Sequence, residues 1–229
     1  MTRPEGAVKV GVAVPAAGSG TRMGGARKPF LELLGETVLA RALAPFLAEP
    51  RVCAVVVALS PDDFRDAPGW ITDLDSRVQV VLGGASRTES VRNALLALPE
   101  GLDIIAVHDA ARPLVTAATV TACIDMAATG VGAVAGCPAV DTLKRVTPEG
   151  RVLDTPDRSS MWHAHTPQVF PAALIRRAYG EGSEGTDDAS LVERIGGVIQ
   201  MVDGGTGNIK VTRPTDVAIA EAILKAQSI

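Results

Sequence analysis

Short apolar runs alternate along the chain with stretches in which apolar residues recur at helical spacing. Residues 8–14 read VKVGVAV, and residues 53–59, 78–82, 104–107 and 132–140 are similarly apolar. Such runs are typical of parallel strands that helices cover on both faces, because a strand with one exposed face alternates polar and apolar residues. We therefore expect an α/β fold with a Rossmann-like, mostly parallel sheet and helices on both faces.

The segments between these runs have apolar residues spaced as on the buried face of a helix. Pro45 should end or kink the first of them, and Pro214 suits the first turn of the last. Residues 198–202 and 208–211 look like late, short strands. Helices are predicted over residues 37–47, 88–98, 116–129, 171–180, 187–195 and 214–226.

Residues 141–162 differ in character from the rest of the chain. They are polar and contain Pro148-Glu149-Gly150 between two short β-prone stretches, which is a turn signal. We expect a projecting β-arm here that packs against a partner surface. The remaining sequence has no linker or repeat, so residues 1–229 are predicted to form a single domain with 141–162 as its arm.

Composition restricts the partners of this chain. The formal net charge of -4 argues against general binding to nucleic acid or to an anionic membrane, so any phosphate site must be local. Cys53, Cys123 and Cys137 are odd in number and widely spaced, which favours reduced buried thiols over a disulfide framework or a metal site. Reduced thiols suggest the cytoplasm, and no apolar run is long enough to cross a bilayer, so we expect a soluble, cytoplasmic protein.

One glycine-rich loop follows the first predicted strand. Residues 14–30 read VPAAGSGTRMGGARKPF and place Arg22 and Lys28 among the glycines. Glycines let backbone N–H groups approach phosphate oxygens, and the two cations supply positive charge for a polyphosphate. A nucleoside triphosphate is the ligand that this loop predicts.

A second polar segment follows the strand predicted over 104–107. Asp109 and Arg112 lie in the sequence HDAARP directly past its carboxyl end. Open α/β sheets bind ligands in the crevice outside these strand ends. We therefore expect Asp109 and Arg112 to lie near the glycine-rich loop.

The glycine-rich loop fits two common phosphate motifs poorly. The GxxxxGK[ST] order of a P-loop is missing, which argues against that kind of kinase or ATPase. A dinucleotide fingerprint is closer, since Gly18-x-Gly20 follows a strand, but the third glycine is displaced and Pro15 stands in the turn. An NAD-binding oxidoreductase thus stays a distant alternative, which tight binding of a nicotinamide cofactor would favour.

Six segments, in order over nearly the whole chain, carry a family resemblance. Together they resemble the 2-C-methyl-D-erythritol 4-phosphate cytidylyltransferase family, and ribitol-5-phosphate cytidylyltransferase is the related alternative. Both enzymes transfer CMP. The segments are PAAGSGTRM at 15–23 with Lys28, VHDAARP at 107–113, DTLK at 141–144, WHAHTPQ at 162–168, TDDAS at 186–190 and NIKVTRP at 208–214.

The resemblance implies a reaction in isoprenoid precursor synthesis. The phosphate of methylerythritol phosphate attacks the α-phosphorus of CTP, which releases pyrophosphate and forms 4-diphosphocytidyl-2-C-methyl-D-erythritol. The task is to align two anions and neutralise growing charge, so fixed cations and Mg²⁺ are expected rather than a general base.

The resemblance also assigns roles to individual residues. Arg22, Lys28 and Lys210 are the implied catalytic cations at the triphosphate, and Asp109 is implied to contact ribose or Mg²⁺. Gly83 and Gly84 let the cytosine edge meet backbone groups, and Ser90 favours a pyrimidine. The implied nucleotide-binding set is Pro15, Ala16, Ala17, Gly18, Ser19, Gly20, Gly83, Gly84, Ser90, Asp109, Ala110 and Ala111.

For the acceptor phosphate, the implied binding residues are Arg112, Thr142, Arg158 and Thr166. Thr142 and Arg158 belong to the predicted arm and, by the resemblance, come from a second subunit. A homodimer with arm exchange is therefore expected.

Some residues depart from the family pattern or invite another interpretation. His163 and His165 alternate as on a strand, but no carboxylate or cysteine nearby completes a metal site, so we interpret them as structural. His165 replaces a typically apolar residue, Arg27 stands where proline is common, and Gly207 stands where an acidic residue often precedes Asn208. None of these changes removes an implied catalytic group.

Overall fold

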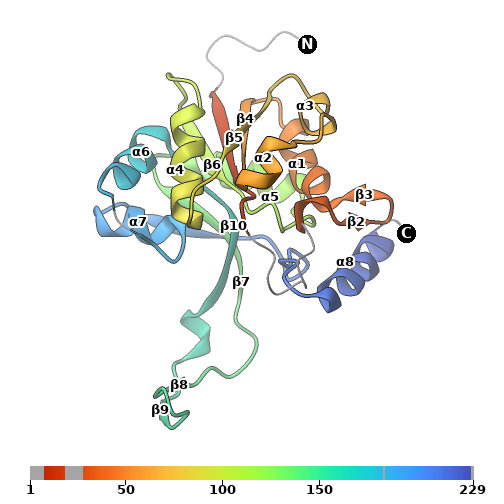
Figure 1. Cartoon of the computed structure of the whole chain (residues 1–229). Coiled ribbons are helices and arrows are strands. Elements are labelled where there is room, and N and C mark those ends of the chain that lie inside the picture. The colour runs from red at the N-terminus through yellow and green to blue at the C-terminus, as the bar shows by residue number, and fades with distance from the viewer. Residues whose placement is uncertain (1–7, 19–27, 183, 228–229) are drawn as a thin grey trace.

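The computed structural model describes residues 8–18, 28–182 and 184–227, whose strands build one large mixed sheet (Figure 1). The strand order is β11-β7-β10-β6-β1-β4-β5. β10 runs antiparallel to β6 and β7, and the other neighbours in the sheet are parallel. The predicted α/β fold with a mostly parallel sheet is confirmed. The strands are β1 (Val10–Pro15), β4 (Val52–Leu59), β5 (Val78–Leu82), β6 (Ile104–Val107), β7 (Gly132–Pro138), β10 (Trp162–Pro171) and β11 (Ile199–Asp203).

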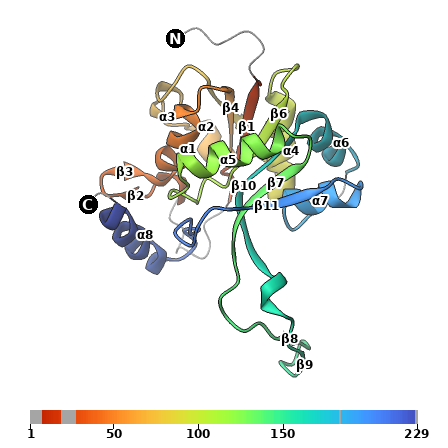
Figure 2. The ribbon, with the colours of Figure 1, turned by 180° about the vertical axis from the view of Figure 1, so that it is seen from behind.

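Helices cover both faces of this sheet, as Figures 1 and 2 show from opposite sides. In β1, Val12 and Val14 face the core that includes α1 and α5, while Ala13 faces the core that includes α4, α6 and α7. Burial of both sets explains why the strand sequence is uniformly apolar. The first face carries α1 (Val38–Ala48), α3 (Trp70–Asp73) and α5 (Ala117–Ala127), and the second carries α4 (Arg87–Ala97), α6 (Ala172–Gly180) and α7 (Asp188–Arg194).

The first long helix does not end at its proline. α1 continues past Pro45 to Ala48, and its buried face includes Leu43 and Phe46 on either side of the proline. Burial of these side chains against the sheet offsets the hydrogen bond that proline cannot donate.

Strand β10 is the element that the apolar pattern did not reveal. Its sequence WHAHTPQVFP is largely polar in its first part, although β10 lies between β6 and β7 inside the sheet. The Gln168 side chain is buried yet satisfied: its Nε2 donates to Asp187 Oδ2 at 2.9 Å and its Oε1 accepts from the Ala189 N–H at 2.8 Å. Polar residues can thus occupy an interior strand because α7 pairs with them.

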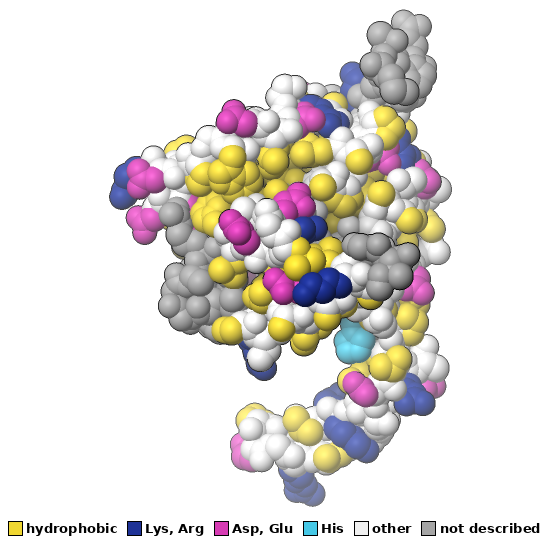
Figure 3. All heavy atoms as spheres, turned by 90° about the vertical axis from the view of Figure 1, so that its right-hand side faces the viewer, with side chains coloured by type: hydrophobic (Ala, Val, Ile, Leu, Met, Phe, Trp, Pro, Cys, Tyr) yellow, Lys and Arg dark blue, Asp and Glu magenta, His cyan; other side chains and the backbone are white. Residues whose placement is uncertain are grey.

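A hairpin projects from the sheet between the end of β7 and the start of β10 (Figures 1 and 2). Trp162 pairs with Pro138 at its base, and the predicted turn with Gly150 joins β8 (Arg145–Val146) to β9 (Val152–Asp154). The short 3-10 helix η3 (Arg158–Ser160) leads back to β10. Lys and Arg side chains gather on the projecting segment, beside exposed apolar ones (Figure 3). The exposed apolar side chains include Val146, Val152, Leu153 and Trp162.

The C-terminal segment packs outside the main layers. Residues 208–211 form no strand, so the β-like prediction for them is wrong. The Val211 N–H donates instead to Ala111 O at 2.8 Å, and the Asn208 carbonyl accepts from Arg112 Nη1. Ala220 of the last helix contacts a small core with Leu33 and Val211. The remaining elements are η2 (Lys28–Phe30), β2 (Glu32–Leu33), β3 (Glu36–Thr37), α2 (Pro61–Arg65) and α8 (Pro214–Gln227).

Candidate active site

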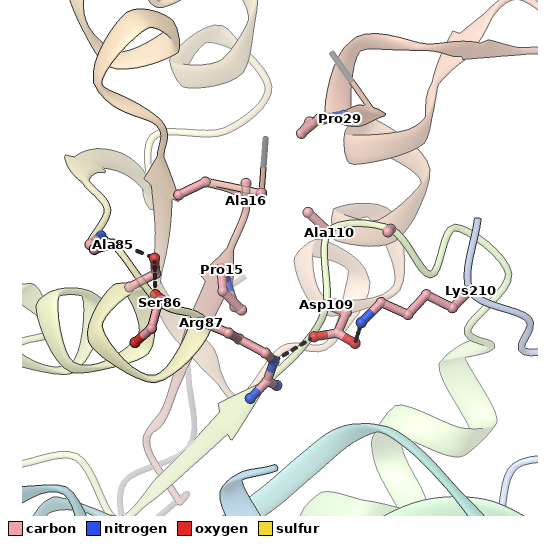
Figure 4. Close-up of a pocket in the computed structure, with 14 residues that line it drawn as sticks. Pro15, Ala16, Pro29, Ala85, Ser86, Arg87, Asp109, Ala110 and Lys210 are labelled. Carbon is pink, nitrogen blue, oxygen red and sulfur yellow. Dashed lines mark hydrogen bonds and ion pairs between the residues drawn. The ribbon is translucent and has the colours of Figure 1, made fainter. Parts of the chain in front are cut away.

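A pocket of about 450 Å³ opens at the carboxyl ends of β1, β5 and β6 (Figure 4). This is the edge at which α/β sheets bind ligands. Residues from the start of the glycine-rich loop, from the turn after β5 and from the loop after β6 converge there. Of the predicted site residues, those lining it are Pro15, Ala16, Ala17, Gly18, Gly84, Ser90, Asp109, Ala110, Ala111 and Lys210.

Part of the glycine-rich loop lies outside the described residues. Ser19, Gly20 and Arg22 fall in that part. Lys28 begins η2, and its side chain is likewise outside the description. Ala16 still belongs to the sheet, because its N–H donates to Ala58 O at 2.8 Å.

The turn after β5 contains two glycines, of which Gly84 lines the first pocket and Gly83, also predicted as a site residue, does not. A Cβ on Gly83 would lie 2.5 Å from Ala17 Cβ and 2.9 Å from Leu59 O, so only glycine fits there. The Gly83 N–H donates to Leu59 O at 2.7 Å, and the Gly84 N–H donates to Ser90 Oγ at 3.0 Å. Ser90 therefore holds the shape of the turn from the first turns of α4.

Asp109 is the most heavily paired carboxylate of the site. Its Oδ1 accepts from Arg87 Nε at 3.0 Å and its Oδ2 accepts from Lys210 Nζ at 2.8 Å, as the dashed lines in Figure 4 show. Arg112 Nε lies 3.8 Å from the same Oδ2. Burial alone would raise the pKa of Asp109, but Arg87 and Lys210 outweigh it and hold the pKa well below its ordinary value. Asp109 is therefore an anion at neutral pH.

Arg87 is the charged residue of the first pocket that sequence reasoning missed, and Pro29, Ala85 and Ser86 are unpredicted lining residues without charge. Arg87 is the first residue of α4, after the N-cap Ser86, and lines the pocket beside Asp109. A cation in the first turn of a helix opposes the helix dipole, which is the signal that could have revealed it. Burial lowers the pKa of Arg87, yet Asp188 and Asp109 outweigh that effect and raise it.

His108 and Thr166 form a buried pair behind Asp109. His108 Nε2 lies 3.1 Å from Arg112 O, which only accepts, so Nε2 carries the proton. His108 Nδ1, at 3.1 Å from Thr166 Oγ1, must then accept the hydroxyl proton. Thr166 Oγ1 in turn accepts from the Asp109 N–H at 3.0 Å. This chain fixes the backbone that presents Asp109, and burial lowers the pKa of His108 to about 4.

A second pocket of about 290 Å³ adjoins the first, with Arg87, Asp109 and Lys210 lining both. Arg112 and Thr166, two of the residues that the resemblance assigns to the acceptor phosphate, both line the second pocket. Arg112 also donates from Nη1 to Asn208 O at 2.7 Å, which ties down the segment that carries Lys210. The other lining residues of the second pocket are Ala164, His165, Gln168, Thr186 and Asp187.

Thr142 and Arg158 lie away from both pockets of their own chain. They belong to the projecting segment, where Arg158 Nη1 donates to Val140 O at 2.8 Å. His163 is exposed, and His165 is half-buried with its pKa lowered to about 4 by burial. Within the described ranges, no three His, Cys, Asp or Glu side chains cluster as a metal site built from protein ligands alone would require.

Basic side chains that converge on the mouth of a glycine-rich turn suit phosphate chemistry. A dinucleotide fingerprint would instead need a third glycine three residues after Gly20, where this sequence has Met23. The fold and the site therefore define an α/β nucleotidyltransferase.

The model of the 2-C-methyl-D-erythritol 4-phosphate cytidylyltransferase (IspD) family matches residues 10–226, and the chain belongs to this family. It is a cytidylyltransferase of the non-mevalonate route to isoprenoid precursors. The oxidoreductase alternative is thereby wrong. Among the described residues, no helix has the length and apolar character that a membrane span needs.

Curated relatives and solved structures agree with this assignment. The cytidylyltransferase of Symbiobacterium thermophilum is 44% identical over 226 residues, which cover 96% of this chain and 95% of the relative. That of Aeromonas hydrophila is 43% identical, with 94% of this chain and 89% of the relative covered. The crystal structure of the Thermus thermophilus enzyme has a TM-score of 0.77 at 32% identity, with 95% and 98% covered. That of the Anaerococcus prevotii synthase has a TM-score of 0.86 at 25% identity, with 96% and 97% covered.

Proposed function

We propose that this chain transfers CMP from CTP to 2-C-methyl-D-erythritol 4-phosphate across the boundary between its two pockets, in a single domain over residues 1–229. The observation that carries this proposal is that Asp109 and Lys210 line both pockets. A group at that boundary meets both the α-phosphate of a nucleotide in the first pocket and an acceptor phosphate in the second.

The first pocket takes CTP. The backbone of residues 16–20 wraps the phosphates, and Arg22 and Lys28 join Lys210 as the cations that stabilise the transition state. Because the N–H groups of Gly83 and Gly84 already donate within the chain, their carbonyl oxygens are the groups that meet the cytosine amino group. The tight turn held by Ser90 leaves room for a pyrimidine rather than a larger purine.

The second pocket takes methylerythritol phosphate. An acceptor phosphate is ionised at neutral pH, since its second pKa is about 6, so its oxygen attacks the α-phosphorus without a general base. The bond to the bridging oxygen of pyrophosphate breaks as the new P–O bond forms. Fixed cations stabilise the charge that grows on both sides of phosphorus, which is the main task in phosphoryl-type transfer.

The residues also fit a magnesium ion held largely by substrate. Mg²⁺ in nucleotide sites is often bound by one or two carboxylates together with phosphate oxygens. Asp109 is the carboxylate that lines the described part of the first pocket, and a carboxylate has lone pairs beyond the two that Arg87 and Lys210 occupy. Asp109 and the phosphates of CTP would hold the ion, which would neutralise charge on them.

We infer that the active enzyme is a homodimer in which each projecting segment completes the partner's site. Arg158 and Thr142 lie outside the pockets of their own chain, and the segment exposes four large apolar side chains that a second copy would cover. A guanidinium gives bidentate hydrogen bonds to phosphate, so Arg158 suits the acceptor.

The test is pyrophosphate release from purified protein. We expect turnover with CTP, methylerythritol phosphate and Mg²⁺ together, and a loss with EDTA. Ribitol 5-phosphate is the matched acceptor, and turnover with it at an equal rate would contradict the proposal. The Lys28→Ala variant should lose transfer by roughly 100-fold or more at an unchanged melting temperature, because a transition-state cation is gone. Near-normal turnover would remove Lys28 from the mechanism.

A further inference from the structure

The TDDAS segment at 186–190 contains a carboxylate that neither pocket explains. Asp187 caps α7, where its Oδ1 accepts from the Ser190 N–H at 3.0 Å, and it lines the second pocket. Asp188, the next residue, lines neither pocket and is 0% exposed. A fully buried carboxylate needs paired hydrogen-bond donors to persist as an anion.

The partner of Asp188 is Arg87. Arg87 Nη1 donates to Asp188 Oδ1 at 3.0 Å and Nη2 donates to Oδ2 at 2.8 Å, which is a bidentate pair. The Tyr179 hydroxyl also donates to Oδ1. The remaining edge of the same guanidinium, Nε, donates to Asp109 Oδ1 at 3.0 Å. A planar guanidinium satisfies both carboxylates in one orientation only.

Asp109 transmits that orientation to Lys210. Its second oxygen, Oδ2, accepts from Lys210 Nζ at 2.8 Å, and Figure 4 shows Arg87 and Lys210 on opposite sides of the carboxylate. The backbone on either side of Lys210 is held through Asn208 O and the Val211 N–H, but neither contact fixes the long Lys210 side chain. The side-chain contact with Asp109 is therefore a principal restraint on where the Lys210 ammonium lies.

We propose that Asp188 and Arg87 are positioning residues for CMP transfer. Asp188 holds the Arg87 guanidinium, Arg87 holds the Asp109 carboxylate, and Asp109 aims Lys210 at the boundary between the pockets. Arg87 lines both pockets, but its charge is committed to two carboxylates rather than to a phosphate. The proposal rests on the proposed function in one respect, namely that Lys210 acts on the reacting phosphates.

The kinetic test uses Asp188→Asn, which keeps the shape of the side chain and removes its charge. We expect kcat to fall by about 10- to 100-fold, the usual effect of a small misplacement of a catalytic group, with the KM for CTP within about threefold of wild type. Glu49→Gln is the matched control. Glu49 is a buried carboxylate that accepts from Arg51 Nε at 2.7 Å and from Nη2 at 3.0 Å, away from both pockets. The Glu49→Gln variant should lower the melting temperature and leave kcat unchanged.

A double variant of Asp188 and Arg87 gives a second test, because a general loss of stability would not produce the expected pattern of kcat values. Arg87→Lys keeps the positive charge but loses the planar guanidinium that contacts both carboxylates, so we expect it to lower kcat as Asp188→Asn does. In the double variant the loss should not exceed that of Arg87→Lys alone, because Asp188 acts through Arg87. Losses that multiply, or a wild-type kcat in either single variant, would overturn the proposal.

A crystal structure of Asp188→Asn separates this proposal from the reaction itself. We expect Lys210 Nζ to leave hydrogen-bond distance of Asp109, whatever acceptor the enzyme uses. An unchanged Asp109–Lys210 contact would overturn the positioning role. If Asp188→Asn does not fold, the same kinetic and structural measurements on Arg87→Lys decide. Failure of the wild-type protein to transfer CMP would contradict the proposed function and leave this structural readout intact.

Discussion

At the scale of single residues, the loop that carries Asp109 is held by hydrogen bonds between buried polar groups. His108 is 0% exposed and bonds to Arg112 O and to the Thr166 hydroxyl. Desolvation disfavours its charged form, which lowers its pKa from an ordinary 6.5 to about 4. The loop that presents Asp109 is thus built on a neutral imidazole.

This burial predicts a pH dependence of stability. Between pH 6.5 and pH 4 the unfolded chain binds a proton at His108 that the folded chain does not, so the free energy of unfolding falls as the pH is lowered through this window. At pH 5 the loss from His108 should be about 2 kcal/mol relative to pH 7. Urea unfolding of wild type and His108→Gln at both pH values measures it.

The His108→Gln variant should lose less stability between pH 7 and pH 5 than wild type does, because the titrating group is gone. His163→Gln changes an exposed histidine and is the control, with the wild-type difference expected. Equal pH dependence in all three proteins would show that His108 does not titrate in this way.

At the scale of elements, α4 does two tasks at once. It packs Val91, Ala94 and Leu95 against the sheet, and its first turns present Arg87 and Ser90 to the pocket. The N-cap Ser86 accepts from the Glu89 N–H at 3.0 Å and fixes where that turn begins. By the proposed function, we therefore expect the start of α4 to affect both stability and nucleotide binding.

Two N-caps allow these effects to be separated. Ser86→Ala and Thr116→Ala each remove a side-chain cap, the second at the start of α5, where Thr116 Oγ1 accepts from the Thr119 N–H at 3.1 Å. Each should lower the free energy of unfolding by about 1 kcal/mol. Only Ser86→Ala should raise the KM for CTP, since Thr116 does not line the pockets. Equal KM values for both variants would argue against the role given to the start of α4.

At the scale of the whole molecule, the projecting hairpin is the feature that one chain does not explain. Its apolar side chains are exposed, and an isolated two-stranded hairpin is marginally stable in water. Contact with a second copy would both stabilise the hairpin and bring Arg158 to an acceptor site. Isologous dimers commonly meet this need.

Subunit complementation tests the shared site. Lys210→Ala and Arg158→Ala should each be inactive alone, but after unfolding and refolding together a mixed dimer has one intact site. With random pairing, half of the dimers are mixed and half of their sites are intact, so about a quarter of wild-type activity should return. Pyrophosphate release after refolding measures it.

The matched control refolds Lys210→Ala with Arg22→Ala. Both residues are proposed to serve the site of their own chain, so no mixed dimer has an intact site and no activity should return. Recovery in this control, or none in the first mixture, would contradict a site shared through Arg158.

The sequence by itself determined the layered fold, and together with the family resemblance it named most of the residues that line the first pocket. Strands covered on both faces are apolar along their length, so β1, β4 and β6 can be recognised from the sequence alone, and the edge strand β5 from its short apolar run. Asp109 was predicted because topology brings the carboxyl ends of parallel strands together, whereas Gly84 was assigned by the family resemblance. The roles of Arg22, Lys28 and Arg158 stay predictions of the family resemblance.

Only the tertiary structure decided the contacts that are distant in sequence. The first part of strand β10 contains several polar residues. Gln168 can be buried there only because Asp187 and the Ala189 N–H at the start of α7 form hydrogen bonds with its side chain. Arg87 gains its role from Asp109 and Asp188, which lie 22 and 101 positions away along the chain. No local pattern encodes such a pairing, because a buried charge is permitted only where folding brings its counter-charges together.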